Sequence, residues 1–152
     1  MIRVITDSTC DIPENLMEQL GIVVVPQVLI WGEQQYRDRV DIQPGEFYQR
    51  LTREVEKPRS SLPGVADFQL AYELAASRGA DELIVVTVSS TLSGTYENAR
   101  KAAEAFSMPV TVVDSTGTSM GMGWQVLAAA RSAEKGTDLK GETPLERMPD
   151  PN

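Results

Sequence analysis

Short apolar runs alternate with amphipathic stretches along the first 136 residues of the chain, and each kind of stretch indicates a different element. A strand that is covered on both faces has few polar positions, so short apolar runs predict buried strands. Three such runs are Arg3–Thr6, Leu83–Val88 and Val110–Val113. Ile22–Trp31 is rich in β-branched residues and predicts a fourth strand. Pro26 cannot donate to a β-ladder, so this strand is expected at a sheet edge or broken at that point.

Helices are expected between the strands, where apolar residues recur at helical spacing and the ends carry start and stop signals. The first expected helix begins at Pro13, with Asp11 as its N-cap, and ends at Leu20. The second begins at Pro44 and ends before Pro58. The other three are expected over Val65–Arg78, Thr95–Phe106 and Trp124–Glu134. In the second helix, Phe47, Tyr48 and Leu51 lie on one side and predict a core-facing stripe. This alternation predicts an α/β fold, a three-layer α/β/α sandwich around a mainly parallel sheet.

The last part of the chain differs in composition from the rest. Thr137–Asn152 has two leucines and one methionine as its only apolar residues, together with three prolines. It shows no periodic stripe, and such segments are typical of loosely packed chain ends. The sequence therefore predicts one α/β domain over residues 1–136 and a loosely packed tail over residues 137–152.

Composition and charge narrow the range of partners and locations. The formal net charge is −8, so the chain has no general attraction to nucleic acid or to an anionic membrane surface. Its longest apolar runs, Ile22–Val25 and Val28–Trp31, are far shorter than the roughly 20 residues of a membrane helix. The first residues, Met1–Asp7, lack the long apolar segment of a secretory signal. We therefore expect a cytoplasmic protein with no membrane span and no nucleic-acid partner.

The absence of histidine excludes several classes of enzyme. The chain has no histidine, and Cys10 is its only cysteine. A Ser-His-Asp or Cys-His pairing, a histidine-ligated zinc site, a phosphohistidine relay and an internal disulfide cannot be formed from this chain alone. The composition favours a binding protein that is not an enzyme and has no cofactor.

Hydroxyl-bearing residues are concentrated in the loops that follow the predicted strands. Ligands of open α/β sheets bind beyond the carboxyl ends of the strands, and three such loops here are rich in serine and threonine: Asp7–Thr9, which includes Ser8, Ser89–Thr95 and Asp114–Ser119. Ser93 and Gly94 are expected at the start of a helix, where free N–H groups and the helix dipole favour a carboxylate or a phosphate. The alternative is that these hydroxyls are ordinary helix caps.

The segment Pro58–Gly64 is bracketed by two prolines and is expected to be an extended, stiffened loop. One interpretation is that the prolines hold the hydroxyls of Ser60 and Ser61 in a fixed orientation, which reduces the entropy lost on binding. The other is a connection without a ligand. Arg59 offers local positive charge beside Ser60, or it is a solvated surface residue.

Three further residues have both a chemical and a structural interpretation. Cys10 lies next to an expected helix start, which can activate a thiol, but it is also a typical small packed residue. Asp7 and Asp114 follow strands, where metal-binding carboxylates occur, but both also suit turns in which the side chain bonds the local backbone.

Seven segments resemble the DegV family in order and spacing, and together they span about 135 residues: Thr6–Asp11, Val24–Pro26, Tyr36–Asp38, Phe47–Tyr48, Pro58–Pro63, Ser89–Tyr96 and Val113–Ser115. The resemblance covers Met1 to about Gly136, which is the first half of a typical member. It implies a carrier that encloses a long-chain fatty acid, with the carboxylate held by hydroxyls at the positions of Ser60 and Ser93. Leu62 replaces a glutamine of the family pattern, and Gly64 replaces a serine.

The resemblance also implies partners. It suggests that the protein presents a fatty acid such as palmitate to a fatty-acid kinase, with Ser61, Gly94 and Ser8 near the ligand. Because the second domain of the family is missing, a homodimer is expected to cover the open acyl wall. Two alternatives are an interaction or assembly fragment that binds no ligand, and a domain related to phosphotransfer proteins, which use a histidine that this chain lacks.

Overall fold

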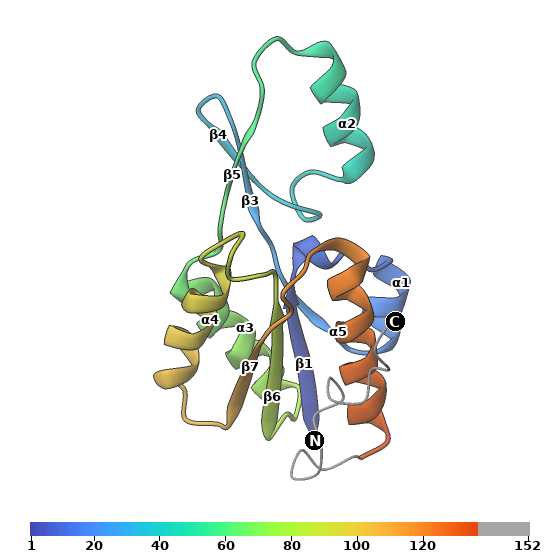
Figure 1. The fold of residues 1–152 in the computed structure, drawn as a ribbon, viewed down its shortest axis with the longest axis vertical. Helices are drawn as coiled ribbons and strands as arrows, with labels where there is room; N and C mark the ends of the chain where they lie inside the picture. Colours follow the sequence, from blue (N-terminus) through green and yellow to red (C-terminus); the bar gives the residue numbers. More distant parts are fainter. Residues whose placement is uncertain (137–152) are drawn as a thin grey trace.

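The structure is a computed structural model that describes residues 1–136, so the predicted tail lies outside the described residues. Its centre is a parallel sheet of four strands in the order β2-β1-β6-β7 (Figure 1). The strands are β1 (Ile2–Asp7), β2 (Val23–Val25), β6 (Glu82–Thr87) and β7 (Val110–Asp114). The sequence predicted all four positions, although it extended β2 too far.

Helices cover both faces of this sheet. On one face lie α1 (Glu14–Gln19) and α5 (Ser119–Glu134), and on the other lie α3 (Val65–Ser77) and α4 (Thr95–Glu104). The side chains of β6 alternate between two buried clusters: Leu83 and Val85 pack with α3 and α4, whereas Ile84 and Val86 pack with α5. The expected three-layer α/β/α sandwich is confirmed, and the continuous apolar run of β6 is explained by burial on both faces.

Beyond the carboxyl end of the parallel sheet, residues 28–61 form a second unit, which we call the arm (Figure 1). It consists of an antiparallel sheet in the order β4-β3-β5 and one helix. The strands are β3 (Val28–Trp31), β4 (Gln34–Arg37) and β5 (Arg59–Ser61), and the helix is α2 (Pro44–Arg53).

A buried tryptophan joins the helix of the arm to its sheet. The rings of Trp31 and Phe47 pack edge to face with centroids 5.8 Å apart, and the guanidinium carbon of Arg50 lies 4.3 Å from the Trp31 ring centroid. The indole N–H of Trp31 donates to the carbonyl of Glu56 at 3.0 Å. Aromatic and cation–π contacts of this kind stabilise small units that lack a large core.

Two sequence predictions about the arm are refined by the structure. The expected break of Ile22–Trp31 at Pro26 is confirmed, because the chain leaves the edge strand β2 there and enters the arm as β3. Pro58–Gly64 is extended as expected, but its centre is the strand β5, because its backbone pairs with β3. The pairing of β3 with β5 joins segments that are far apart in the sequence.

Predictions about three helices also need correction. The stripe of Phe47, Tyr48 and Leu51 does not face the core, since α2 covers only the small arm sheet and has no buried residue; Tyr48 is 63% exposed. The N-cap of α1 is Pro13, whereas Asp11 has a left-handed backbone with φ 52° and ends the 3₁₀ helix η1 (Ser8–Cys10).

Helix α5 begins at Ser119, five residues before the predicted start at Trp124. At Gly123 in this helix, a Cβ atom would stand 2.6 Å from the carbonyl oxygen of Cys10. Glycine therefore lets α5 approach η1 closely, although it is a poor helix former. Cys10 itself is buried, and burial raises the pKa of its thiol, which confirms the packed rather than the reactive interpretation.

We expect Gly123→Ala to lower the free energy of unfolding by about 1 to 3 kcal/mol, because the added methyl group overpacks the contact with Cys10. Gly121→Ala is the matched control on the same helix, since a Cβ there meets nothing within 4 Å. The control should leave stability unchanged or raise it by up to about 1 kcal/mol. Urea denaturation of both variants measures the difference, and equal stabilities would show that the close approach is absent.

Candidate ligand-binding site

The carboxylate of Asp7 lies at the carboxyl end of β1 and is fully buried. Its Oδ1 accepts hydrogen bonds from the backbone N–H of Thr9 at 3.0 Å and from the Thr9 hydroxyl at 2.5 Å, and its Oδ2 accepts the N–H of Val88 at 2.8 Å. The side-chain amide of Gln27 also donates to Oδ1, at 3.4 Å. A buried carboxylate needs such partners, so Asp7 fixes the loops after β1 and β6 and is not a free metal ligand.

Asp114 has a similar role at the end of β7. Its Oδ1 accepts the N–H groups of Ser90 at 3.2 Å and Thr116 at 2.9 Å. Desolvation opposes the charged carboxylate, but hydrogen bonds from Ser90 and Thr116 outweigh it and hold the pKa of Asp114 below its ordinary value. Within residues 1–136, no three histidine, cysteine, aspartate or glutamate side chains are grouped so that they could hold a metal ion.

The turn before α4 carries the polar groups that are best placed for a ligand. The hydroxyls of Ser93 and Thr95 are hydrogen-bonded at 2.8 Å, and the N–H of Thr95 donates to the Ser93 oxygen at 3.2 Å. Gly94 is the N-cap of α4 and is exposed, while Ser93 is half-buried. Ser93 thus serves as a local cap, and its hydroxyl group also lies where the first N–H groups of the helix favour an anion.

The two serines of strand β5 point in opposite directions. Ser60 pairs with Leu29 and Ser61 with Val28, and successive side chains of a strand lie on opposite faces. Ser60 therefore shares the face of Leu29, and Ser61 lies on the other face with Arg59.

The residues after β5 pack directly on the start of α4. A Cβ atom on Gly94 would lie 3.2 Å from Cδ1 of Leu62, and the side-chain amide of Asn98 donates to the carbonyl of Pro63 at 3.0 Å. Segments more than 30 residues apart in the sequence are thus brought together at the start of α4.

Ser8 is placed differently from the other candidate residues. It is buried, and its hydroxyl oxygen accepts the backbone N–H of Gln27 at 3.0 Å. That bond lies where the chain passes from β2 to β3, so Ser8 stabilises the junction between the parallel sheet and the arm.

Sequence reasoning missed Gln27, which connects these groups. Its side-chain amide donates to Asp7 and, at 3.4 Å, to the hydroxyl of Thr95, which in turn is bonded to Ser93. The available signal was a polar residue directly after Pro26 in an otherwise apolar run. Its partners lie 20 and 68 residues away, so the local pattern could not reveal them.

Exposed apolar side chains lie on both sides of the polar turn. Leu62 is 39% exposed and Leu92 is 65% exposed, and they lie in the segments that flank Ser93 and Gly94. Hydroxyl groups, a helix start and exposed leucines thus occur together, which suits a ligand with an anionic end and an apolar part.

No helix within residues 1–136 is long and apolar enough to cross a membrane.

The chain matches a family model described as an uncharacterised protein of the DegV family, over residues 1–143. The chain belongs to the DegV family. A DegV domain-containing protein of Clostridium acetobutylicum is 37% identical over 123 residues, which are 80% of this chain and 43% of that protein. The family resemblance of the sequence motifs is therefore confirmed.

Solved structures of DegV proteins share the fold. One from Thermus thermophilus, described as a fatty-acid-binding DegV family protein, is 38% identical with a TM-score of 0.83 and covers 95% of this chain and 51% of its own. One from Thermotoga maritima, described as revealing a fatty acid binding function, is 30% identical with a TM-score of 0.85 and covers 96% and 53%. This chain spans about half the length of the relatives that it matches.

We expect Ser8→Ala to lower the free energy of unfolding by about 1 to 3 kcal/mol, because the buried N–H of Gln27 loses its acceptor. Ser61→Ala removes a half-buried hydroxyl for which the described structure shows no hydrogen bond, so it should change stability by less than about 0.5 kcal/mol. Denaturant titration compares the two. A Ser8 variant as stable as the Ser61 variant would contradict a structural role for Ser8.

Proposed function

We propose that this chain binds a long-chain fatty acid such as palmitate and performs no bond chemistry on it. The observation that carries the proposal is the position of exposed Leu62 and Leu92 beside the Ser93 hydroxyl and the start of α4. A fatty acid has the two complementary parts, a carboxylate for the hydroxyl and N–H groups and an acyl chain for the leucines. The similar Thermus and Thermotoga proteins, which are described as fatty-acid-binding, support the same class of ligand.

In this proposal, Ser60 and Ser93 donate to the carboxylate, and Gly94 lets the ligand approach the first turn of α4. Gly94 is exposed and has no side chain to cover that turn. The alternation along β5 favours Ser60 over Ser61 as the second donor, because Leu62, two residues after Ser60, contacts the Gly94 side. Ser61 and Ser8 act indirectly, by supporting β5 and the junction at Gln27.

The wider role also stays a proposal. The relatives that it matches are about twice as long as this chain, and within the described residues Leu62 and Leu92 are exposed. An acyl chain of about 14 methylenes gains about 11 kcal/mol from full burial, before the costs of binding are subtracted. We propose that a second copy covers the acyl chain in a homodimer, and that the complex presents the fatty acid to a fatty-acid kinase. A cytoplasmic location remains a prediction from the sequence.

We expect Ser93→Ala and Ser60→Ala each to weaken palmitate binding by about ten- to a hundredfold, because each variant removes a hydrogen bond to a charged group. Ser61→Ala is the matched control on the same strand and should bind within about twofold of the original chain. The double variant of Ser60 and Ser93 should be non-additive if both hydroxyls hold one carboxylate. Titration with a fluorescent fatty acid measures all four affinities.

An unchanged affinity for the fatty acid in the Ser93 variant would show that Ser93 caps the helix and does not bind the ligand. Equal losses in the Ser60 and Ser61 variants would contradict the assignment by strand face. If the original chain binds no fatty acid, the result favours the alternative that the chain is an interaction or assembly fragment without a ligand.

A further inference from the structure

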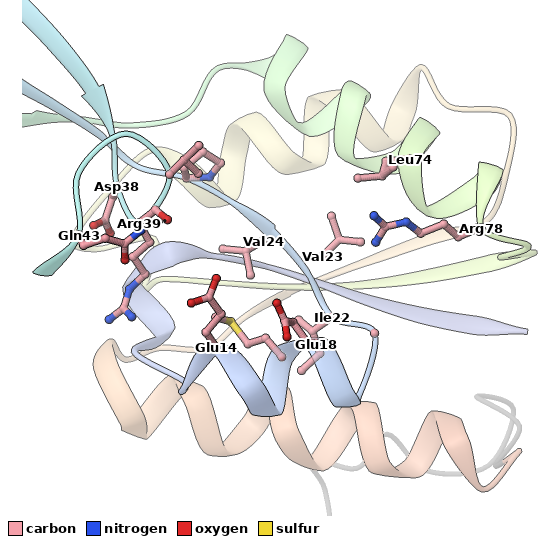
Figure 2. A pocket seen from close by; sticks show the side chains of 14 residues that line it. Glu14, Glu18, Ile22, Val23, Val24, Asp38, Arg39, Gln43, Leu74 and Arg78 are labelled. Atoms are coloured by element: carbon pink, nitrogen blue, oxygen red, sulfur yellow. Dashed lines mark hydrogen bonds between the residues drawn. The ribbon is translucent and has the colours of Figure 1, made fainter.

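The outer edge of β2 is open within residues 1–136. β2 is an edge strand of the parallel sheet, and within residues 1–136 it pairs with β1 only. The free side of an edge strand presents backbone N–H and C=O groups that can pair with another extended segment. A cleft of about 460 Å³ runs along this strand (Figure 2).

The floor of the cleft is apolar. It is formed mainly by Ile22, Val23 and Val24 of the edge segment, with Met17 from α1 and Pro26 at one end. Val24 is only half-buried. An extended backbone laid against β2 would therefore cover apolar surface as well as gain hydrogen bonds.

The two walls of the cleft differ in charge. Glu14 and Glu18 project from α1 on one side, and Leu74 and Arg78 project from α3 on the other (Figure 2). Among residues 1–136, neither glutamate nor Arg78 takes part in an ion pair. Arg39, at the end of the cleft, is already paired with Asp11 at 3.0 Å.

The spacing of these side chains matches that of a strand. Residues four apart on a helix are separated by about 6 Å along its axis, and alternate residues of a strand are separated by about 6.6 Å. Glu14 and Glu18 are four apart, as are Leu74 and Arg78. A strand added to β2 would turn its alternate side chains toward α1 and α3 in step with these pairs.

We propose that the edge of β2 binds an extended peptide segment of a partner protein. Alternate side chains of the segment point toward α1, and these are basic residues that face Glu14 and Glu18. The other side chains point toward α3, and they are an apolar residue against Leu74 and an acidic residue against Arg78. This site is separate from the proposed fatty-acid site and does not depend on it.

A second copy of the chain fits this edge poorly. Antiparallel pairing of two β2 strands about a two-fold axis keeps each face of the sheet on the same side, so α1 of one copy would meet α1 of the other. Glu14 and Glu18 would then face Glu18 and Glu14 of the second copy. Like charges at such short range are unfavourable.

The test uses acetylated and amidated tetrapeptides and amide NMR spectra of the full chain. Two probe peptides have the sequences Glu-Lys-Val-Lys and Lys-Val-Lys-Glu. One is for each direction in which the peptide could run along β2. The control peptide, Val-Lys-Lys-Glu, has the same composition but breaks the alternation. We expect at least one probe to shift the amide signals of Val23, Val24 and Val25, and the control to bind more weakly.

Matched protein variants test the charges. Glu14→Gln with Glu18→Gln should weaken binding of the probe by about two- to thirtyfold, which is the range for two exposed ion pairs. Glu33→Gln with Glu46→Gln makes the same charge change on the arm and should leave binding unchanged. The proposal is overturned if neither probe shifts these amides, or if the control peptide or the Glu14/Glu18 variant binds equally well. Signals of β2 that move with protein concentration alone would overturn it in favour of a second copy.

Discussion

The buried carboxylate of Asp7 is the group on which the arrangement of the site depends. It joins three segments that meet at the carboxyl edge of the parallel sheet: the turn after β1 through Thr9, the end of β6 through Val88, and the base of the arm through Gln27. A carboxylate without such donors would be costly to bury. Its hydrogen bonds therefore hold in one geometry the loops from which the Ser93 turn and the arm start.

Gln27 extends this network to the proposed ligand site. Its backbone is fixed by Ser8, and its side chain links Asp7 to Thr95, the hydroxyl partner of Ser93. The arm touches the start of α4 again through Leu62. The arm is thus connected to the start of α4 at two points, through Gln27 and through Leu62.

The parts of this structure that follow from local patterns could be predicted from the sequence. The apolar run of β6 required burial on both faces, and Pro44 and Gly79 marked a helix start and a helix end. The order of strands and helices then gave the parallel sandwich. The Ser93 turn was found because it follows β6 and opens a helix.

The parts that depend on distant partners could not be predicted in this way. Pro26 indicated a break but not that β3 would pair with β4 and β5, and the apolar side of α2 gave no sign that it would cover only a small sheet. The close approach of α5 to η1 joins Gly123 to Cys10, which lies more than 100 residues earlier in the chain. Ser8 and Ser93 are equivalent in the sequence as hydroxyls after strands, and only the structure shows that one is buried at a junction.

Native mass spectrometry of the protein purified from cells tests most directly whether the described domain offers a carboxylate site with an apolar margin. We expect a retained mass equal to that of a long-chain fatty acid in the original chain and in the Ser61→Ala variant, and its loss in the double variant of Ser60 and Ser93. A protein that carries no such mass, even after incubation with excess palmitate, would contradict the claim.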